Sequence, residues 1–224
     1  MPGRVLITGA GRRTGRALAE YLAAQGYDLI LHYHNGEAEA TQLADSLGGS
    51  AVYGDFGHAQ GVSDFLRRVH ALSAPIDAFI YTVGPYLQDS LLSIAEPDWR
   101  RLFELSVHAP LYLTRGLLPM RSVVMFGMTG LQRTDPKRSA YQAVKSAQWH
   151  MLRGLAKELA PARVRVNMLS PGYLENSIDL PGAFPPCSWG ECVALDDVCR
   201  LTHTLLETEQ LTGQNIEIAG GIGL

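Results

Sequence analysis

The sequence has few lysines and no strong excess of either charge. Only three of its 224 residues are lysine, whereas arginine supplies 16 of its 19 basic residues. The formal net charge is −3 at pH 7. This charge gives no electrostatic basis for binding nucleic acid or an anionic membrane surface. We therefore expect no nucleic-acid or membrane partner, and we expect a small-molecule substrate instead.

Cysteine is also scarce, and no apolar run approaches the length that spans a membrane. The three cysteines are Cys187, Cys192 and Cys199. Their number is odd, and their spacing lacks the paired pattern of a structural metal site. We therefore predict reduced thiols in a cytoplasmic protein, with no disulfide framework and no metal.

What the sequence does contain is a regular alternation of short apolar runs and helical patterns. Its 46% hydrophobic and 18% charged residues are typical of a folded domain, and its length suits one large α/β domain. Apolar strands that alternate with helices indicate a parallel sheet covered on both faces. We predict a single doubly wound α/β domain over residues 1–224, with about seven parallel strands. The predicted strands are residues 5–8, 28–33, 50–53, 76–81, 122–126, 164–169 and 215–219.

Two long helices are predicted, over about residues 98–118 and 137–160. The following segment, residues 174–195, breaks the alternation, because it carries Pro181, Pro185 and Pro186 with several glycines. A long irregular segment in a compact domain usually serves a function. We therefore predict a substrate lid over about residues 174–195.

The second long helix carries Tyr141 and Lys145, four residues apart. Residues at this spacing share a helix face, so the ammonium of Lys145 can lie beside the phenol. A nearby cation lowers the pKa of a phenol, and such a tyrosine can give a proton to a carbonyl or an imine at neutral pH. Chance is a weak explanation in a chain with three lysines, although a solvated helix face with one lysine is the alternative.

A glycine-rich turn follows the first predicted strand, at residues 8–15. A turn of this kind before a helix places backbone N–H groups and the helix N-terminus against a pyrophosphate. The end of the second strand has no carboxylate to bind a ribose 2′-hydroxyl, and Arg12 and Arg13 lie in the neighbouring turn. NADP(H) is therefore favoured over NAD(H). The alternatives are a tight turn without a ligand, and a metal site at His32 and His34 that lacks a third ligand.

Further short segments match one known family. They are residues 54–56, 83–84, 165–167, 170–172, 211–214 and 220–221. Together with the glycine turn and the Tyr141–Lys145 pair, they make the chain resemble the short-chain dehydrogenase/reductase family over nearly its whole length. The resemblance implies a Rossmann-like fold with the cofactor at the carboxyl ends of the strands.

The same resemblance assigns roles to residues around the cofactor. It implies that Asp55 bonds the adenine amino group, Phe56 gives a backbone contact there, and Gly84 lines the adenine ribose. Lys145 is expected to hold the nicotinamide ribose hydroxyls. The predicted cofactor-binding residues are Gly9, Arg12, Arg13, Thr14, Gly15, His34, Asn35, Asp55, Phe56, Gly84, Tyr141, Lys145, Pro171 and Gly172.

Two features of the chain resemble one subgroup, the pteridine reductases. Arg13 stands where the glycine turn usually has a glycine, and residues 32–34 read His-Tyr-His. In pteridine reductases the corresponding arginine reaches the cofactor phosphates and the pterin. The resemblance therefore implies a pterin-like ring as the first substrate to consider.

Three positions depart from the pattern of the family. Met128 lies thirteen residues before Tyr141, where a serine is usual, and a methionine can neither donate nor accept a proton. The neighbouring Thr129 can supply a hydroxyl after a one-residue shift of the loop. Ser106 aligns with an asparagine that normally holds a proton-relay water, and residues 81–84 replace Asn-Asn-Ala-Gly. The predicted catalytic residues are Tyr141, Lys145, Ser106 and Thr129.

These features predict an NADPH-dependent oxidoreductase that reduces a carbonyl or an imine, in reaction class EC 1.1.1 or 1.5.1. The alternative to a pterin is a 3-oxoacyl thioester or a simple ketone. Loss of one hydrogen-bond donor typically costs about two to three powers of ten in rate, so Met128 also leaves open a nucleotide-binding protein with degraded catalysis. Apolar residues on the two long helices, with the family resemblance, predict a homotetramer or a homodimer.

Overall fold

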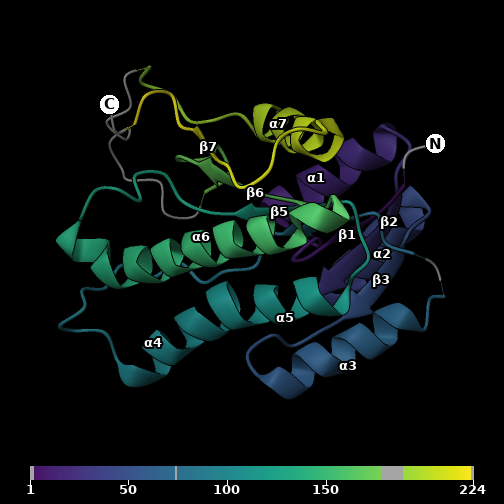
Figure 1. The fold of residues 1–224 in the computed structure, drawn as a ribbon, viewed down its shortest axis with the longest axis horizontal. Helices are drawn as coiled ribbons and strands as arrows, with labels where there is room; N and C mark the ends of the chain where they lie inside the picture. Colours follow the sequence, from purple (N-terminus) through teal and green to yellow (C-terminus); the bar gives the residue numbers. More distant parts are fainter. Residues whose placement is uncertain (1–2, 74, 178–188, 223–224) are drawn as a thin grey trace.

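The computed structural model describes residues 3–73, 75–177 and 189–222. Seven strands form one sheet in the order β3-β2-β1-β4-β5-β6-β7, with every neighbouring pair parallel (Figure 1). The predicted doubly wound parallel sheet is therefore confirmed. The strands are β1 (Arg4–Ile7), β2 (Asp28–Tyr33), β3 (Ser50–Tyr53), β4 (Ala78–Tyr81), β5 (Ser122–Phe126), β6 (Arg165–Pro171) and β7 (Asn215–Ile218).

Helices connect the successive strands. Between α4 and α5 the helix widens into one turn of π-helix, Glu104–His108, which is called the π turn below. Short 3₁₀ turns flank α6 at Pro136–Arg138 and Ala160–Ala162. The α-helices are α1 (Arg13–Ala24), α2 (Glu37–Leu47), α3 (Ala59–His70), α4 (Glu96–Phe103), α5 (Ala109–Gly116), α6 (Ser139–Leu159) and α7 (Leu195–Glu207).

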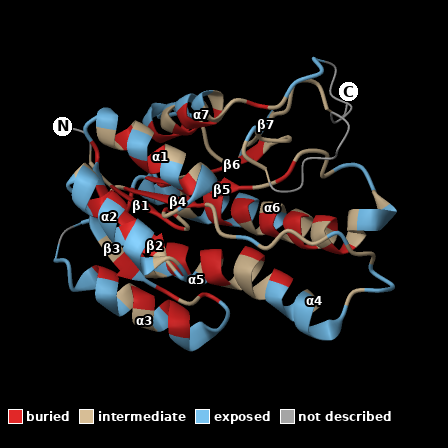
Figure 2. Ribbon diagram, turned by 180° about the vertical axis from the view of Figure 1, so that it is seen from behind, coloured by how far each residue is buried: buried red, intermediate tan, exposed pale blue. Residues whose placement is uncertain are grey.

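Two hydrophobic cores lie on the two faces of the sheet. Helices α3, α5 and α6 cover one face, and α1, α2 and α7 cover the other. Strand β1 contributes to both, because Leu6 belongs to the first core while Val5 and Ile7 belong to the second. Figure 2 shows the buried residues in red along the strands and the inner sides of the helices. Burial on both faces explains why the strands read as continuous apolar runs in the sequence.

The strand order reverses at β1. The chain first builds outward to β2 and β3, and it then returns to β4 on the other side of β1. Ligands of open α/β sheets bind at the carboxyl ends of the strands at such a reversal. Here Thr8, directly after β1, accepts at Oγ1 a hydrogen bond of 3.0 Å from the backbone N–H of Thr82, directly after β4. This bond joins the carboxyl ends of these two neighbouring strands.

The helices differ from the sequence prediction in two places. The long helix predicted at residues 98–118 is α4, the π turn and α5 in succession. Helix α7 was not predicted at all. Its buried residues Val198, Thr202 and Leu205 have helical spacing. The helix begins where the predicted lid ends, and the irregular lid segment obscured this spacing.

The predicted lid is described only at its two ends. Val193 donates its backbone N–H to the carbonyl of Tyr173 at 2.8 Å, and Leu195 donates its N–H to Oε1 of Glu175 at 2.9 Å. These bonds join the two ends of the segment at the start of α7. Residues 178–188 lie outside the described residues, so the lid itself stays a prediction.

Within residues 3–73, 75–177 and 189–222, no helix combines the length and the apolar character needed to cross a membrane. The same residues contain no group of three or more His, Cys, Asp or Glu side chains placed to hold a metal ion.

Candidate active site

Helix α6 brings Tyr141 and Lys145 to one face, as the sequence predicts. Lys145 is buried, and its Nζ lies 5.7 Å from the centroid of the Tyr141 ring. The ammonium donates a hydrogen bond of 2.9 Å to the backbone carbonyl of Phe126, at the end of β5. A second bond, also 2.9 Å, goes to Oε1 of Gln148 on the next turn of α6. The cation is therefore held in place beside the phenol ring.

Burial changes the acid–base behaviour of this lysine. Removal of the ammonium from water lowers the pKa of Lys145 to about 8. The side chain still carries its charge over most molecules at pH 7, so it can stabilise a negative charge on a neighbouring phenol oxygen.

A second tyrosine and an arginine stand next to Tyr141. The ring of Tyr86, in the loop after β4, meets the Tyr141 ring edge-on at a centroid distance of 5.4 Å. Arg138, one turn before Tyr141, hydrogen-bonds both Tyr86 and the Oδ2 of Asp135, the latter at 2.9 Å. These neighbours were not predicted from the sequence, because no motif marks them and the loop after β4 has no regular pattern.

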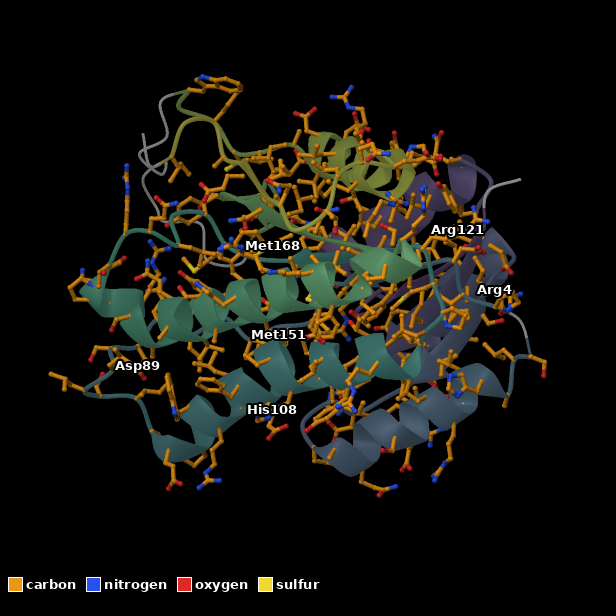
Figure 3. All side chains as sticks on the ribbon, in the orientation of Figure 1. Arg4, Asp89, His108, Arg121, Met151 and Met168 are labelled. Carbon is orange, nitrogen blue, oxygen red and sulfur yellow. The ribbon has the colours of Figure 1, made fainter. Side chains whose placement is uncertain are left out.

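The π turn places Ser106 in a fully buried position on the element packed against α6. The hydroxyl of Tyr81, at the end of β4, donates to the carbonyl of Leu105 at 2.5 Å and ties the sheet to this turn. Ser106 Oγ has no hydrogen-bond partner among the described residues. His108 lies on the same turn (Figure 3) and pairs with Glu104 at 3.0 Å. Ser106 is thus a buried hydroxyl available near α6, which fits its predicted role without testing it.

The loop after β5 carries the position where the family usually has a serine. Met128 is buried, with 8% of its surface exposed, whereas Thr129 is half-buried. The next residue, Gly130, donates its N–H to Oε1 of Glu217 at 3.3 Å and so links this loop to β7. The replacement of the missing serine by the hydroxyl of Thr129 stays a prediction.

The glycine turn after β1 has the close backbone packing that a phosphate cradle needs. Gly9 has φ +63°, and a Cβ on Gly15 would lie 2.2 Å from the carbonyl oxygen of Gly9. Glycine is therefore required at both positions. Helix α1 starts without a side-chain cap at Arg12, which leaves its first N–H groups for an anion. The turn fits the pyrophosphate of a dinucleotide.

His32 has a role that the sequence analysis did not find. Its Nδ1 accepts a 3.0 Å hydrogen bond from the N–H of Gly9, and its Nε2 lies 3.0 Å from the carbonyl of Gly54. The ring also stacks on Phe56 at a centroid distance of 4.1 Å. Burial is the main cause that lowers the pKa of His32 to about 4. A neutral imidazole with Nε2–H thus fastens the glycine turn to the ends of β2 and β3.

A cavity of about 680 Å³ opens beside this turn. Its size lies within the range of ligand pockets, and it has no carboxylate from the end of β2. The side chain of Asp55 is held within its own loop, because its Oδ1 accepts a hydrogen bond of 2.9 Å from the N–H of Gly57. The predicted cofactor-binding residues that line the cavity are Gly9, Arg12, His34, Asn35, Asp55, Phe56 and Gly84.

The other predicted cofactor-binding residues, Tyr141 and Lys145 included, do not line this cavity. Among the described residues that line it, Arg13, Thr14 and Gly15 are missing, as are Pro171 and Gly172. Helix α4 contributes Arg100 and Arg101 instead, which the sequence analysis did not foresee.

The wall of the cavity approaches the Tyr141–Lys145 pair at Gly84. A Cβ built on Gly84, in the wall of the cavity, would lie 3.5 Å from Nζ of Lys145. The ammonium therefore lies close to Gly84 in the wall of the cavity and beside the ring of Tyr141. A nucleotide that occupies the cavity would extend toward both side chains.

Comparison with known proteins agrees with this arrangement. The enoyl-(acyl carrier protein) reductase family model matches residues 9–183. The uncharacterized oxidoreductase YmfI of Bacillus subtilis is 28% identical, over 96% of this chain and 97% of the relative.

Two solved structures share the fold. A short-chain dehydrogenase from Burkholderia cenocepacia in complex with NADP superposes with a TM-score of 0.90 at 23% identity, covering 99% of this chain and 98% of the other. A 3-oxoacyl (acyl-carrier-protein) reductase from Agrobacterium tumefaciens with NADP bound gives 0.86 at 23% identity, over 97% and 93%. Because the family match includes both the glycine turn and the helix of Tyr141 and Lys145, the chain belongs to the short-chain dehydrogenase/reductase family.

Proposed function

We propose that this oxidoreductase uses NADPH to reduce a carbonyl or an imine. The observation that carries the proposal is the buried Lys145 ammonium, fixed beside Tyr141 and close to Gly84 in the wall of the cavity. Structural relatives with NADP or NADPH bound support the choice of cofactor. The absence of a carboxylate at the end of β2, with Arg12 and Asn35 in the wall of the cavity, supports a 2′-phosphate.

The protein side of the reaction follows from these residues. NADPH, when bound, supplies the hydride that reduces the substrate carbon. Tyr141 donates its phenolic proton to the substrate oxygen or nitrogen, which becomes a hydroxyl or an amine. The Lys145 ammonium stabilises the phenolate that this transfer leaves behind. The glycine turn and Asp55 hold the nucleotide, and Lys145 also serves its nicotinamide ribose.

The substrate that we place first is a 3-oxoacyl thioester or a simple ketone. The 3-oxoacyl (acyl-carrier-protein) reductase among the structural neighbours favours this class. The pterin hypothesis loses support, because His32 is buried and bonded within the chain, and Arg13 is exposed and lies outside the described wall of the cavity. A pterin stays in the substrate panel as the second candidate.

Oxidation of NADPH with a panel of substrates tests this proposal. The panel contains a 3-oxoacyl thioester, a ketone, a quinone and a dihydropterin. Tyr141→Phe is expected to abolish turnover and to leave NADPH affinity nearly intact, since the phenol acts mainly in the transition state. If no substrate is reduced while NADPH still binds, the protein is a nucleotide-binding protein with degraded catalysis.

We also propose that the chain forms a homotetramer or a homodimer through α5 and α6. Some of the apolar residues of the two long helices pack inside the chain, since Leu113, Leu117, Val144 and Leu155 are buried. Met151 remains half-buried on α6, between α6 and α5 in Figure 3. Light scattering at micromolar concentration measures the mass, and a monomer would contradict the proposal.

A further inference from the structure

Gln148 is a polar residue of α6 that contacts the Lys145 ammonium. It is fully buried, and its Oε1 accepts the 2.9 Å hydrogen bond from Nζ. Within the described residues this is the only hydrogen bond of its side chain, and its Nε2 has no partner. A buried amide with an unpaired donor is costly to folding. The bond to Lys145 is the one interaction that this amide makes in return.

The two acceptors define where the ammonium can lie. Phe126 offers a backbone carbonyl from β5, and Gln148 offers a side-chain oxygen from the next helical turn. An ammonium has three N–H donors, so these acceptors occupy two and leave one. Without the Gln148 oxygen, the long and flexible lysine side chain would be held by one bond instead of two.

We propose that Gln148 is a positioning residue, which holds the Lys145 ammonium beside Tyr141 and against the end of β5. The consequence for turnover rests on the proposed function, whereas the positioning itself does not. An acceptor oxygen also favours the charged form of the lysine and opposes the effect of burial.

Neighbouring charged groups are not the cause of the lowered pKa of Lys145. Burial is the single cause behind its lowered pKa. On α6 itself the ionisable side chains are Tyr141, His150, Arg153, Lys157 and Glu158. On the elements packed against α6 they are Glu96, Asp98, Arg100 and Arg101 of α4, Glu104 and His108 of the π turn, Lys137 and Arg138 of the 3₁₀ turn, and Arg165 of β6.

The first test measures Lys145 directly, in the protein without cofactor. Because the chain has three lysines and the other two, Lys137 and Lys157, are exposed, isotope-labelled lysine gives one signal from a buried ammonium. NMR titration of that signal gives its pKa. Gln148→Leu removes the acceptor and is expected to lower the pKa by about one unit. Gln148→Glu places a carboxylate against the ammonium and is expected to raise it by about one to three units.

Gln142 offers a matched control on the same helix. It is also buried, but its amide bonds the backbone of Asp135 and Arg133 rather than a lysine. Gln142→Leu therefore removes a buried amide from α6 and is expected to leave the Lys145 titration unchanged. If Gln148→Leu does not fold, Gln148→Met and Gln148→Glu carry the same comparison.

The second test measures kcat and its pH profile with the substrate found in the panel. We expect Gln148→Leu to lower kcat about tenfold and to shift the profile in the direction of the Lys145 titration. An unshifted lysine titration in both Gln148→Leu and Gln148→Glu overturns the positioning role, whatever the activity. A shifted titration in a protein that reduces no substrate supports the positioning and contradicts the proposed function instead.

Discussion

Loss of the His32 imidazole should change how the stability of the protein depends on pH. His32 is buried and neutral, and its Nδ1 must stay unprotonated to accept the N–H of Gly9. Its pKa is lowered to about 4 in the folded chain, mainly by burial, from the ordinary 6.5. Below pH 6.5 the unfolded chain takes up a proton that the folded chain refuses. The contribution of His32 to stability is therefore complete above pH 6.5 and decreases as the pH falls toward 4.

The size of this effect follows from the two pKa values. A difference of one unit corresponds to about 1.4 kcal/mol, so the full loss over the window is about 3 kcal/mol. Between pH 7 and pH 5 the loss is about 2 kcal/mol. Urea unfolding at the two pH values measures it for the wild type and for His32→Gln, which does not titrate.

Other groups also titrate between pH 5 and 7, so the difference between the two proteins is the meaningful quantity. The wild type should lose about 2 kcal/mol more than His32→Gln on acidification. His150→Gln, on the exposed side of α6, controls for the loss of an imidazole and should behave like the wild type. An equal pH dependence in wild type and His32→Gln would show that His32 is not the buried neutral link described above.

Three further predictions concern Arg12, the glycine turn and the loop after β5. Arg12→Ala should weaken NADPH binding by about tenfold and leave NADH binding nearly unchanged, because Arg12 lines the cavity beside Asn35; calorimetric titration with both nucleotides measures this. Gly15→Ala forces a Cβ against the carbonyl of Gly9 and should lower the free energy of unfolding by about 1–3 kcal/mol. Gly154→Ala is the control, because Gly154 has open space around it, and thermal unfolding compares the two variants. Thr129→Val should lower kcat/KM about tenfold or more if its hydroxyl replaces the missing serine, and an unchanged value would exclude that role.

The sheet was predictable because its strands carry the information locally. Strands β2, β3 and β5 begin and end at the predicted residues, since each is a short apolar run between turn residues. The Tyr141–Lys145 pair and the glycine turn were also predictable, because each lies within a few consecutive residues of the chain. Spacing along the chain alone is sufficient for such features.

The remaining features depend on contacts between distant segments. His32 joins Gly9 to Gly54, and neither partner can be identified from the residues next to His32. The π turn interrupts a helix that the apolar pattern predicts as continuous. A π-helical turn holds one more residue than an α-helical turn but requires no particular residue type, so the sequence does not mark it. In the sequence, Gln148 is a single polar residue on a buried helix face. Its proposed positioning role depends on the 2.9 Å hydrogen bond to Lys145, which only the structure shows.

The most direct test of the central claim follows a deuterium label from the cofactor into the product. The protein is incubated with NADPH deuterated at the transferable position and with the best substrate of the panel, and the product is analysed by mass spectrometry. The account predicts one deuterium on the reduced carbon for the wild type, and no product above background for Tyr141→Phe. An unlabelled product, or equal product from Tyr141→Phe, would contradict the assignment of Tyr141 as the proton donor of an NADPH-dependent reductase.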